Sequence, residues 1–140
     1  MNGATRVAGY YPSISPDGAK VAFMSTYAID IGDNNNQSDI YLRTMSNTAP
    51  VLVSRTSTGA IATGGGATQP SYSNSGGQER IAFISYATNM TPTTDANGVA
   101  DAFVRNMTSS TTTLVSRATG SGALADTGAQ EVSIARDGSS

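Results

Sequence analysis

The chain has 140 residues, of which 38% are apolar and 13% are charged, and its formal net charge at pH 7 is −2. This balance argues against a nucleic-acid surface, which needs clustered positive charge to neutralise phosphates. Cysteine and histidine are both absent, which excludes disulfides, thiolate metal sites, cysteine nucleophiles and Ser-His-Asp catalysis. Because no apolar run reaches membrane-spanning length and the start has no apolar core, we expect neither membrane insertion nor a signal peptide.

Four short strands are predicted in the first sixty residues. The first, at 11–15, ends at the turn Pro16-Asp17-Gly18, in which proline sets φ at one corner and glycine accepts the positive φ that follows. The second, at 20–26, is apolar on both faces, so we expect it to be buried on both sides. Alternating apolar residues predict the third and fourth strands at 39–45 and 50–54.

The same plan returns about sixty residues later. The string VAFMS at 21–25 recurs as IAFIS at 81–85, and Asp39 of the third strand corresponds to Asp101. These matches predict strands at 69–73, 80–86, 101–107 and 111–116, with the turn at 74–79 two residues longer than its counterpart. A third copy begins at 132–138, which matches 12–18. A fixed period of this length is typical of repeat architectures, whose single units cannot bury their apolar faces alone.

The predicted fold class is all-β, with each unit a four-stranded antiparallel meander. Such a meander is a β-propeller blade or one sheet of a sandwich, and the repeat favours the propeller. We therefore expect one repeat domain over 1–140, with blade 1 at 11–55, blade 2 at 69–117 and the opening strand of a third repeat at 130–138. The stretches 59–68 and 120–128, rich in small residues, are predicted to be crossings between blades; flexible linkers are the alternative.

The repeat resembles the TolB-like propellers, which are built from PD40 (WD40-like) repeats. The string from Pro12 to Phe23, followed by Asp39-Ile40-Tyr41, matches the pattern of that family closely, and the second unit matches less well because Asn74 and Ser75 replace its Pro-Asp. This resemblance covers most of the chain. It implies a closed six-bladed ring and a role as a bacterial binding scaffold or a gating domain attached to a peptidase. It also implies a periplasmic or extracellular location.

Two blades and one further strand do not close a ring of the usual four to eight blades. The sequence leaves three alternatives: a fragment of a longer propeller protein, an assembly of several chains, or an open two-blade piece. Three copies would supply six blades, so we expect a homo-oligomer, with a trimer favoured, because open edges and faces would otherwise remain in water. The trailing strand is expected either to add to a neighbouring chain's sheet edge or to be without a role.

Each unit has one loop with the pattern Asp-x-Asn-x-x-x-Asp, which leads into its third strand. Their oxygen-bearing groups at alternate positions are the ligands that calcium prefers, and no other cofactor is expected. The alternative is structural, because Asp, Asn and Gly are also the residues that turns favour. The candidate calcium ligands are Asp33, Asn35, Gln37 and Asp39 in the first loop and Asp95, Asn97, Val99 and Asp101 in the second.

Other repeated or aromatic residues are candidates for structural contacts or ligand binding. The arginines recur at matched positions, which predicts repeated contacts with carboxylates or carbonyls: Arg43 with Arg105, and Arg55 with Arg117. Four tyrosines are candidates for a sugar-binding surface, with core packing or edge cover as the alternative: Tyr10, Tyr11, Tyr27 and Tyr86. No catalytic residue can be assigned, so we expect a non-catalytic module that binds a protein or carbohydrate ligand.

Overall fold

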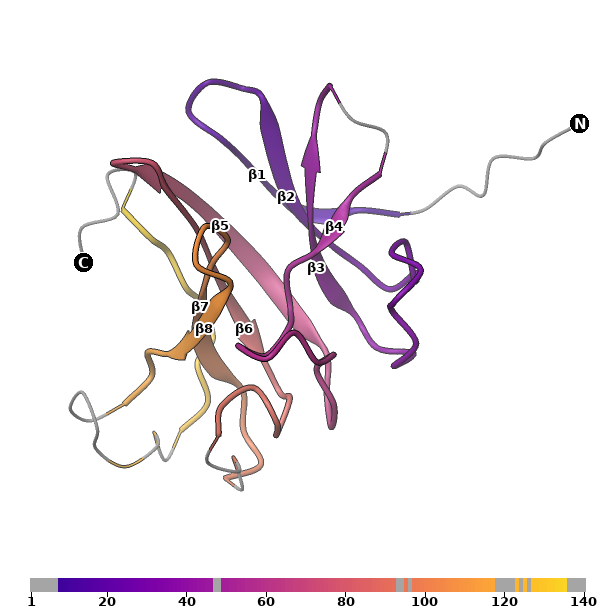
Figure 1. The fold of residues 1–140 in the computed structure, drawn as a ribbon. Helices are drawn as coiled ribbons and strands as arrows, with labels where there is room; N and C mark the ends of the chain where they lie inside the picture. Colours follow the sequence, from indigo (N-terminus) through magenta and orange to yellow (C-terminus); the bar gives the residue numbers. More distant parts are fainter. Residues whose placement is uncertain are drawn as a thin grey trace, which may run out of the picture.

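The computed structural model describes residues 8–46, 49–92, 95, 97–117, 123, 125 and 127–135. These residues form two four-stranded antiparallel sheets and no helix (Figure 1). In the first sheet the strands are β1 (Tyr10–Ile14), β2 (Lys20–Ser25), β3 (Asp39–Thr44) and β4 (Val51–Leu52). In the second they are β5 (Ala67–Ser75), β6 (Gln78–Ser85), β7 (Asp101–Asn106) and β8 (Thr111–Leu114). Both sheets pair their strands in chain order, so the predicted all-β meanders are confirmed.

The hairpin between β5 and β6 is longer than the sequence predicts. The residues assigned to a loop at 74–79 continue the ladder, in which Ser75 pairs with Gln78. Gly76 and Gly77, with φ of 56° and 76°, make the tight turn between them, because glycine adopts positive φ without steric cost. The prediction of a longer turn is therefore wrong, and the two extra residues lengthen the strands.

The fourth strand of the first sheet is shorter than predicted. It ends at Leu52, and Ser54 takes over as a side-chain partner: the Ser54 hydroxyl accepts the Ile40 N–H at 3.0 Å. A side-chain acceptor in place of a ladder carbonyl satisfies the backbone donor and ends the pairing.

The two sheets share one apolar core. Ala22, Ile40 and Leu42 face the second sheet and are packed in a cluster with Ile81 and Phe83. A stacked aromatic pair lies on corresponding strands of each sheet, with ring centroids 6.0 Å apart in the first (Phe23–Tyr41) and 5.9 Å apart in the second (Phe83–Phe103). Because burial of one large apolar side chain contributes about 1.5–3 kcal/mol, this shared core is a major source of stability.

Burial differs between the two corresponding strands β2 and β6. All residues of β6 from Ile81 to Ser85 are buried, whereas in β2 Val21 and Phe23 are only half-buried. The burial on both sides predicted for 20–26 is therefore found only in part in β2, and it is more complete in the corresponding strand β6. The reason is position: the side of β6 that carries Ile81 and Phe83 packs against the first sheet, whereas no other described sheet covers the corresponding side of β2.

The segment 59–68 is a packed crossing, not a flexible linker. Ala62 and Ala67 are buried, and the Ala67 N–H donates to the Ser38 carbonyl at 2.7 Å. Its glycines permit close approach, because a Cβ added to Gly66 would lie 2.2 Å from the Ser38 hydroxyl. The segment 120–128 lies largely outside the described residues.

The predicted third opening strand, 130–138, is described only as far as residue 135. Residues 127–135 are not assigned to a strand, and they lie beside the second sheet (Figure 1). Within the described part of the chain, no helix is long and apolar enough to cross a membrane.

Candidate functional site

The first Asp/Asn loop is held together by the side-chain amide of Asn35. Its Nδ2 donates to Asp39 Oδ2 at 2.9 Å and to the Ala62 carbonyl at 3.2 Å. Its Oδ1 accepts the Gln37 N–H at 2.8 Å. Both acidic side chains are buried, and Asp33 Oδ2 accepts the hydroxyl of Tyr41. Hydrogen bonds between protein groups therefore connect the candidate residues, except for the exposed side chain of Gln37.

The second loop repeats this geometry. Asn97 Nδ2 donates to Asp101 Oδ2 at 3.1 Å and to the Ala125 carbonyl at 3.1 Å, and its Oδ1 accepts the Val99 N–H at 3.0 Å. Asp95 and Asp101 are both buried. Gly98 has a φ of 72°, as expected for the sharp turn in this loop. The two loops thus have the same pattern of hydrogen bonds.

The hydrogen bonds fix which way each asparagine amide faces. Rotating the amide of Asn35 by 180° would place its oxygen against the Ala62 carbonyl and its nitrogen against the Gln37 N–H, and both contacts would be repulsive. The NH₂ group therefore faces the Asp39 carboxylate, where a calcium site would need an oxygen. No cluster of three or more acidic side chains suited to a metal ion occurs among the residues that the structure describes. Calcium binding at these loops stays a prediction.

A serine completes each loop. Ser54 Oγ donates to Asp39 Oδ1 at 2.5 Å, and Ser116 Oγ donates to Asp101 Oδ1 at 2.5 Å. Each hydroxyl also accepts the first N–H after its aspartate. Sequence reasoning missed this role, although the signal was present: the pair Ser-Arg recurs at 54–55 and at 116–117.

The environment of these loops shifts the pKa of two carboxyl groups. Burial raises the pKa of Asp39 to about 6, although the hydrogen bonds from Ser54 and Asn35 oppose the shift. Burial also raises the pKa of Asp95, and the nearby Asp101 adds to that shift. The cause in both cases is the cost of removing a charged carboxylate from water.

The loops join each sheet to the segment that starts the next repeat. The carbonyls that the two asparagines bind, those of Ala62 and Ala125, lie in corresponding crossing segments. A backbone bond repeats beside them: the Ala67 N–H donates to the Ser38 carbonyl at 2.7 Å, and the Ala129 N–H donates to the Ala100 carbonyl at 2.7 Å. The Asp/Asn loops are therefore junctions between successive repeats.

The opening segments of the repeats are joined by a serine in each case. Ser13 Oγ of β1 accepts the Tyr72 N–H of β5 at 2.9 Å. Ser71 Oγ of β5 accepts the Ile134 N–H of the C-terminal segment at 3.2 Å. Because Ser13 and Ser71 occupy matched positions, residues 127–135 contact β5 through the same bond by which β5 contacts β1.

The matched arginines have different surroundings. Arg105 is buried and donates through Nη1 to the Thr56 carbonyl at 2.8 Å and to Thr112 Oγ1 at 3.0 Å. Arg55 lies 3.7 Å from Asp30 and donates to the Gly59 carbonyl at 2.9 Å. The predicted contacts with carbonyls and carboxylates are confirmed for these two. Arg43 is exposed and forms no contact of this kind with the described residues.

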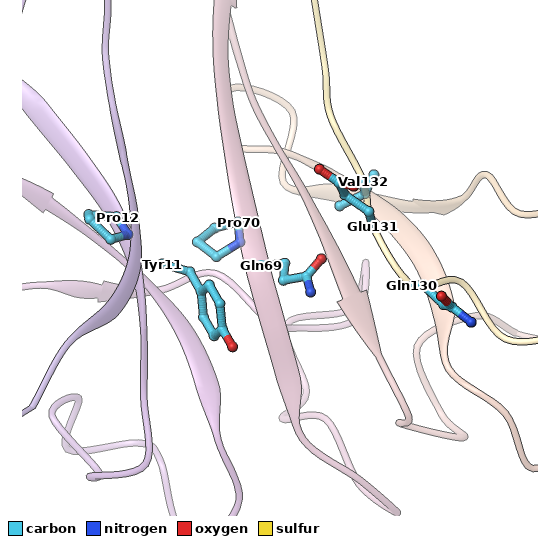
Figure 2. Close-up of a pocket in the computed structure, with 7 residues that line it drawn as sticks. All are labelled: Tyr11, Pro12, Gln69, Pro70, Gln130, Glu131 and Val132. Atoms are coloured by element: carbon cyan, nitrogen blue, oxygen red, sulfur yellow. The ribbon is translucent and has the colours of Figure 1, made fainter.

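A cavity of about 400 Å³ lies where the three opening segments meet (Figure 2). It is lined by Tyr11 and Pro12 of β1, Gln69 and Pro70 of β5, and residues 130–132. The sequence offered one hint of it, the tyrosines at 10 and 11. The candidate calcium ligands do not line this cavity, so the structure separates the junction loops from it.

No protein-family model matches the chain. Curated proteins provide no match either. The resemblance to the TolB-like propellers therefore stays an expectation from the sequence motifs.

The four tyrosines named as candidates for a sugar-binding surface all lie partly exposed to solvent. All are about half exposed, between 47% and 57%, so core packing is excluded for Tyr10, Tyr11, Tyr27 and Tyr86. Only Tyr11 lines the cavity between the opening segments. It is the tyrosine of this group that has polar neighbours from two other repeats.

Proposed function

We propose that this chain is a β-propeller module, a non-catalytic scaffold for binding or structure whose sheets are successive blades. The observation that carries the proposal is the repeated junction. Three kinds of hydrogen bond join the first repeat to the second: the asparagine-to-carbonyl bond, the backbone bond after the crossing, and the serine bond between opening segments. The same three kinds join the second repeat to Ala125, Ala129 and Ile134.

A repeated junction is expected of stacked repeats and not of a sandwich. In a two-sheet sandwich, β1 would contact β5, but nothing in the fold would require β5 to form the same contact with a third segment. In a propeller or solenoid each unit contacts the next by one operation. The motif resemblance to TolB-like proteins adds the expectation of a six-bladed ring.

The second sheet packs against the first through one of its faces, and the corresponding face of the first sheet is partly exposed. In the second sheet that face carries Phe83, Phe103 and the buried Arg105, which reaches the Thr56 carbonyl of the first repeat. The corresponding face of the first sheet carries a half-buried Phe23 and an exposed Arg43. A further blade placed against it would give Arg43 the carbonyl partners that Arg105 has.

We assign that further blade to a second copy of this chain, and three copies would supply the six blades of a closed ring. The alternative is a longer TolB-like protein, a cell-surface protein or the gating domain of a peptidase, in which another part of the same chain covers the face. No catalytic step belongs to either version. The buried carboxylates hold junction loops and do not line the cavity between the opening segments.

The variant Arg43→Met tests the assembly. Under the proposal it weakens association at least about tenfold, because about 1.4 kcal/mol of lost contact suffices for that factor. The matched control is Ile31→Glu, which changes the net charge by the same amount at a fully exposed loop residue. Analytical ultracentrifugation over a concentration series measures both. Equal association constants for the two variants would contradict the assignment of this face.

A further inference from the structure

The cavity between the opening segments is built from equivalent positions of three repeats. The positions of Tyr11 and Pro12 in β1 correspond to those of Gln69 and Pro70 in β5 and to those of Glu131 and Val132 in the C-terminal segment. Figure 2 shows these side chains on three neighbouring segments, together with Gln130. The serine bonds Tyr72 to Ser13 and Ile134 to Ser71 fix the separation of the segments. The cavity is thus a product of the repeat and lies within one chain.

The backbone is bent at two of these positions. Tyr11 and Gln69 have φ of 52° and 53°, and each lies at an irregularity in the ladder between the first two strands of its sheet. Glycine adopts such a conformation freely, whereas a residue with a Cβ is strained in it. Strained bulges of this kind redirect side chains and occur often beside functional sites. Here they place a phenol and a carboxamide at the cavity.

The polar groups at the cavity have few partners in the protein. Gln69 Oε1 is buried and accepts no hydrogen bond. No hydrogen bond or ion pair joins the side chains of Tyr11, Gln130 or Glu131 to any described residue. A buried acceptor without a donor is costly, and most such groups in native proteins are satisfied. Because this oxygen is shielded from solvent, a ligand with hydroxyl donors would reach it only after the Gln69 carboxamide turns toward the cavity.

We propose that this cavity binds a saccharide. Two carboxamides and one carboxylate offer both donors and acceptors, which suits the hydroxyl groups of a sugar. The exposed rings of Tyr11 and Pro12 offer apolar surface for the C–H face of a pyranose, whereas Pro70 is buried in the lining. The volume of about 400 Å³ falls within the range of small-ligand sites. This inference names the ligand class of the proposed scaffold and rests on its binding role, but it does not require assembly.

A cationic side chain from a partner protein is the competing occupant. It would satisfy the Glu131 carboxylate and the Gln69 oxygen. However, the NH₂ groups of Gln69 and Gln130 are donors, and an ammonium or guanidinium group has no acceptor for them. A neutral ligand with hydroxyl groups matches the donor and acceptor set more completely, because each hydroxyl both donates and accepts.

The test is a titration of the ¹⁵N-labelled chain, followed by NMR, with three neutral probes: maltotriose, xylotriose and N,N′,N″-triacetylchitotriose. N-acetyl-arginine amide is the cationic probe. We expect at least one saccharide to shift the resonances of residues 10–13, 68–72 and 130–134. The variant Gln69→Met, which removes the unpaired oxygen at similar length, should weaken binding at least about tenfold without lowering the melting temperature. The control Asn34→Leu changes an exposed carboxamide that is not a candidate ligand and should leave binding unchanged.

Several results would overturn the saccharide site. One is the absence of such shifts with all three saccharides at about 10 mM; another is a response to the arginine derivative alone. Unchanged binding in both Gln69→Met and Tyr11→Leu would also contradict it, and the second variant keeps the test valid if the first misfolds. Light scattering on the same samples tests the two proposals separately. A monomer that binds sugar would refute the assembly and support the saccharide site. A trimer that binds no sugar would support the assembly and refute the site.

Discussion

Replacing Arg105 by methionine is the most informative perturbation of the contact between the sheets. The guanidinium donates to the Thr56 carbonyl at 2.8 Å and to Thr112 Oγ1 at 3.0 Å, and the side chain is 7% exposed. Hydrogen bonds from a charged donor contribute about 1.5–3 kcal/mol each. Burial of the Arg105 guanidinium carries a desolvation cost, which is also why the pKa of this arginine is lowered. The substitution recovers part of that cost and removes the buried Nε, which has no hydrogen-bond partner.

The net result should be a loss of about 2–3 kcal/mol in the free energy of unfolding, or about 6–10 °C in melting temperature for a chain of this size. Far-UV circular dichroism with urea and with heat measures both quantities. The matched variant Arg43→Met, measured at a dilution where the chains are separate, should change the free energy by less than about 0.5 kcal/mol because the side chain is exposed. Equal losses in the two variants, or none in Arg105→Met, would refute a stabilising role of Arg105 in the contact between the two sheets.

The junction loops yield two further predictions. Since the folded-state pKa of Asp39 is raised to about 6 from 3.8, the folded state binds this proton more tightly, and stability should fall as pH rises from about 4 to about 6. In Asp39→Asn this pH dependence should flatten, and overall stability should drop because one of the two hydrogen-bond donors, Ser54 or Asn35, would meet an NH₂ group; identical pH profiles would contradict the assignment. If calcium binds the loops as the sequence predicts, adding it should raise the melting temperature and a chelator should lower it, whereas an unchanged transition would remove the calcium hypothesis.

The repeat made the strands predictable, because each strand pattern could be checked against its copy. All eight strands were placed from the sequence, and all their ends agree within two residues. The largest differences follow from local chemistry that periodicity does not contain. Gly76 and Gly77 form a turn tight enough to extend the β5–β6 ladder, and Ser54 replaces a ladder carbonyl with its hydroxyl.

The functional residues were less predictable, because their partners come from other repeats. Asn35 looks like a metal ligand in the sequence, yet its amide binds the carbonyl of Ala62, 27 residues away. Arg43 and Arg105 occupy the same position in the repeat, but only Arg105 has a preceding sheet to contact. Gln69 resembles any polar strand residue until its backbone is seen to bend toward the cavity.

The molar mass in solution is the measurement that tests the central claim most directly. If the first sheet's open face takes the next blade from a second copy, light scattering coupled to size exclusion should give three times the mass of one chain, and the Arg43→Met variant should dissociate at higher concentration than the native chain. A native chain that remains a stable, soluble monomer at every concentration would contradict self-assembly into a closed ring.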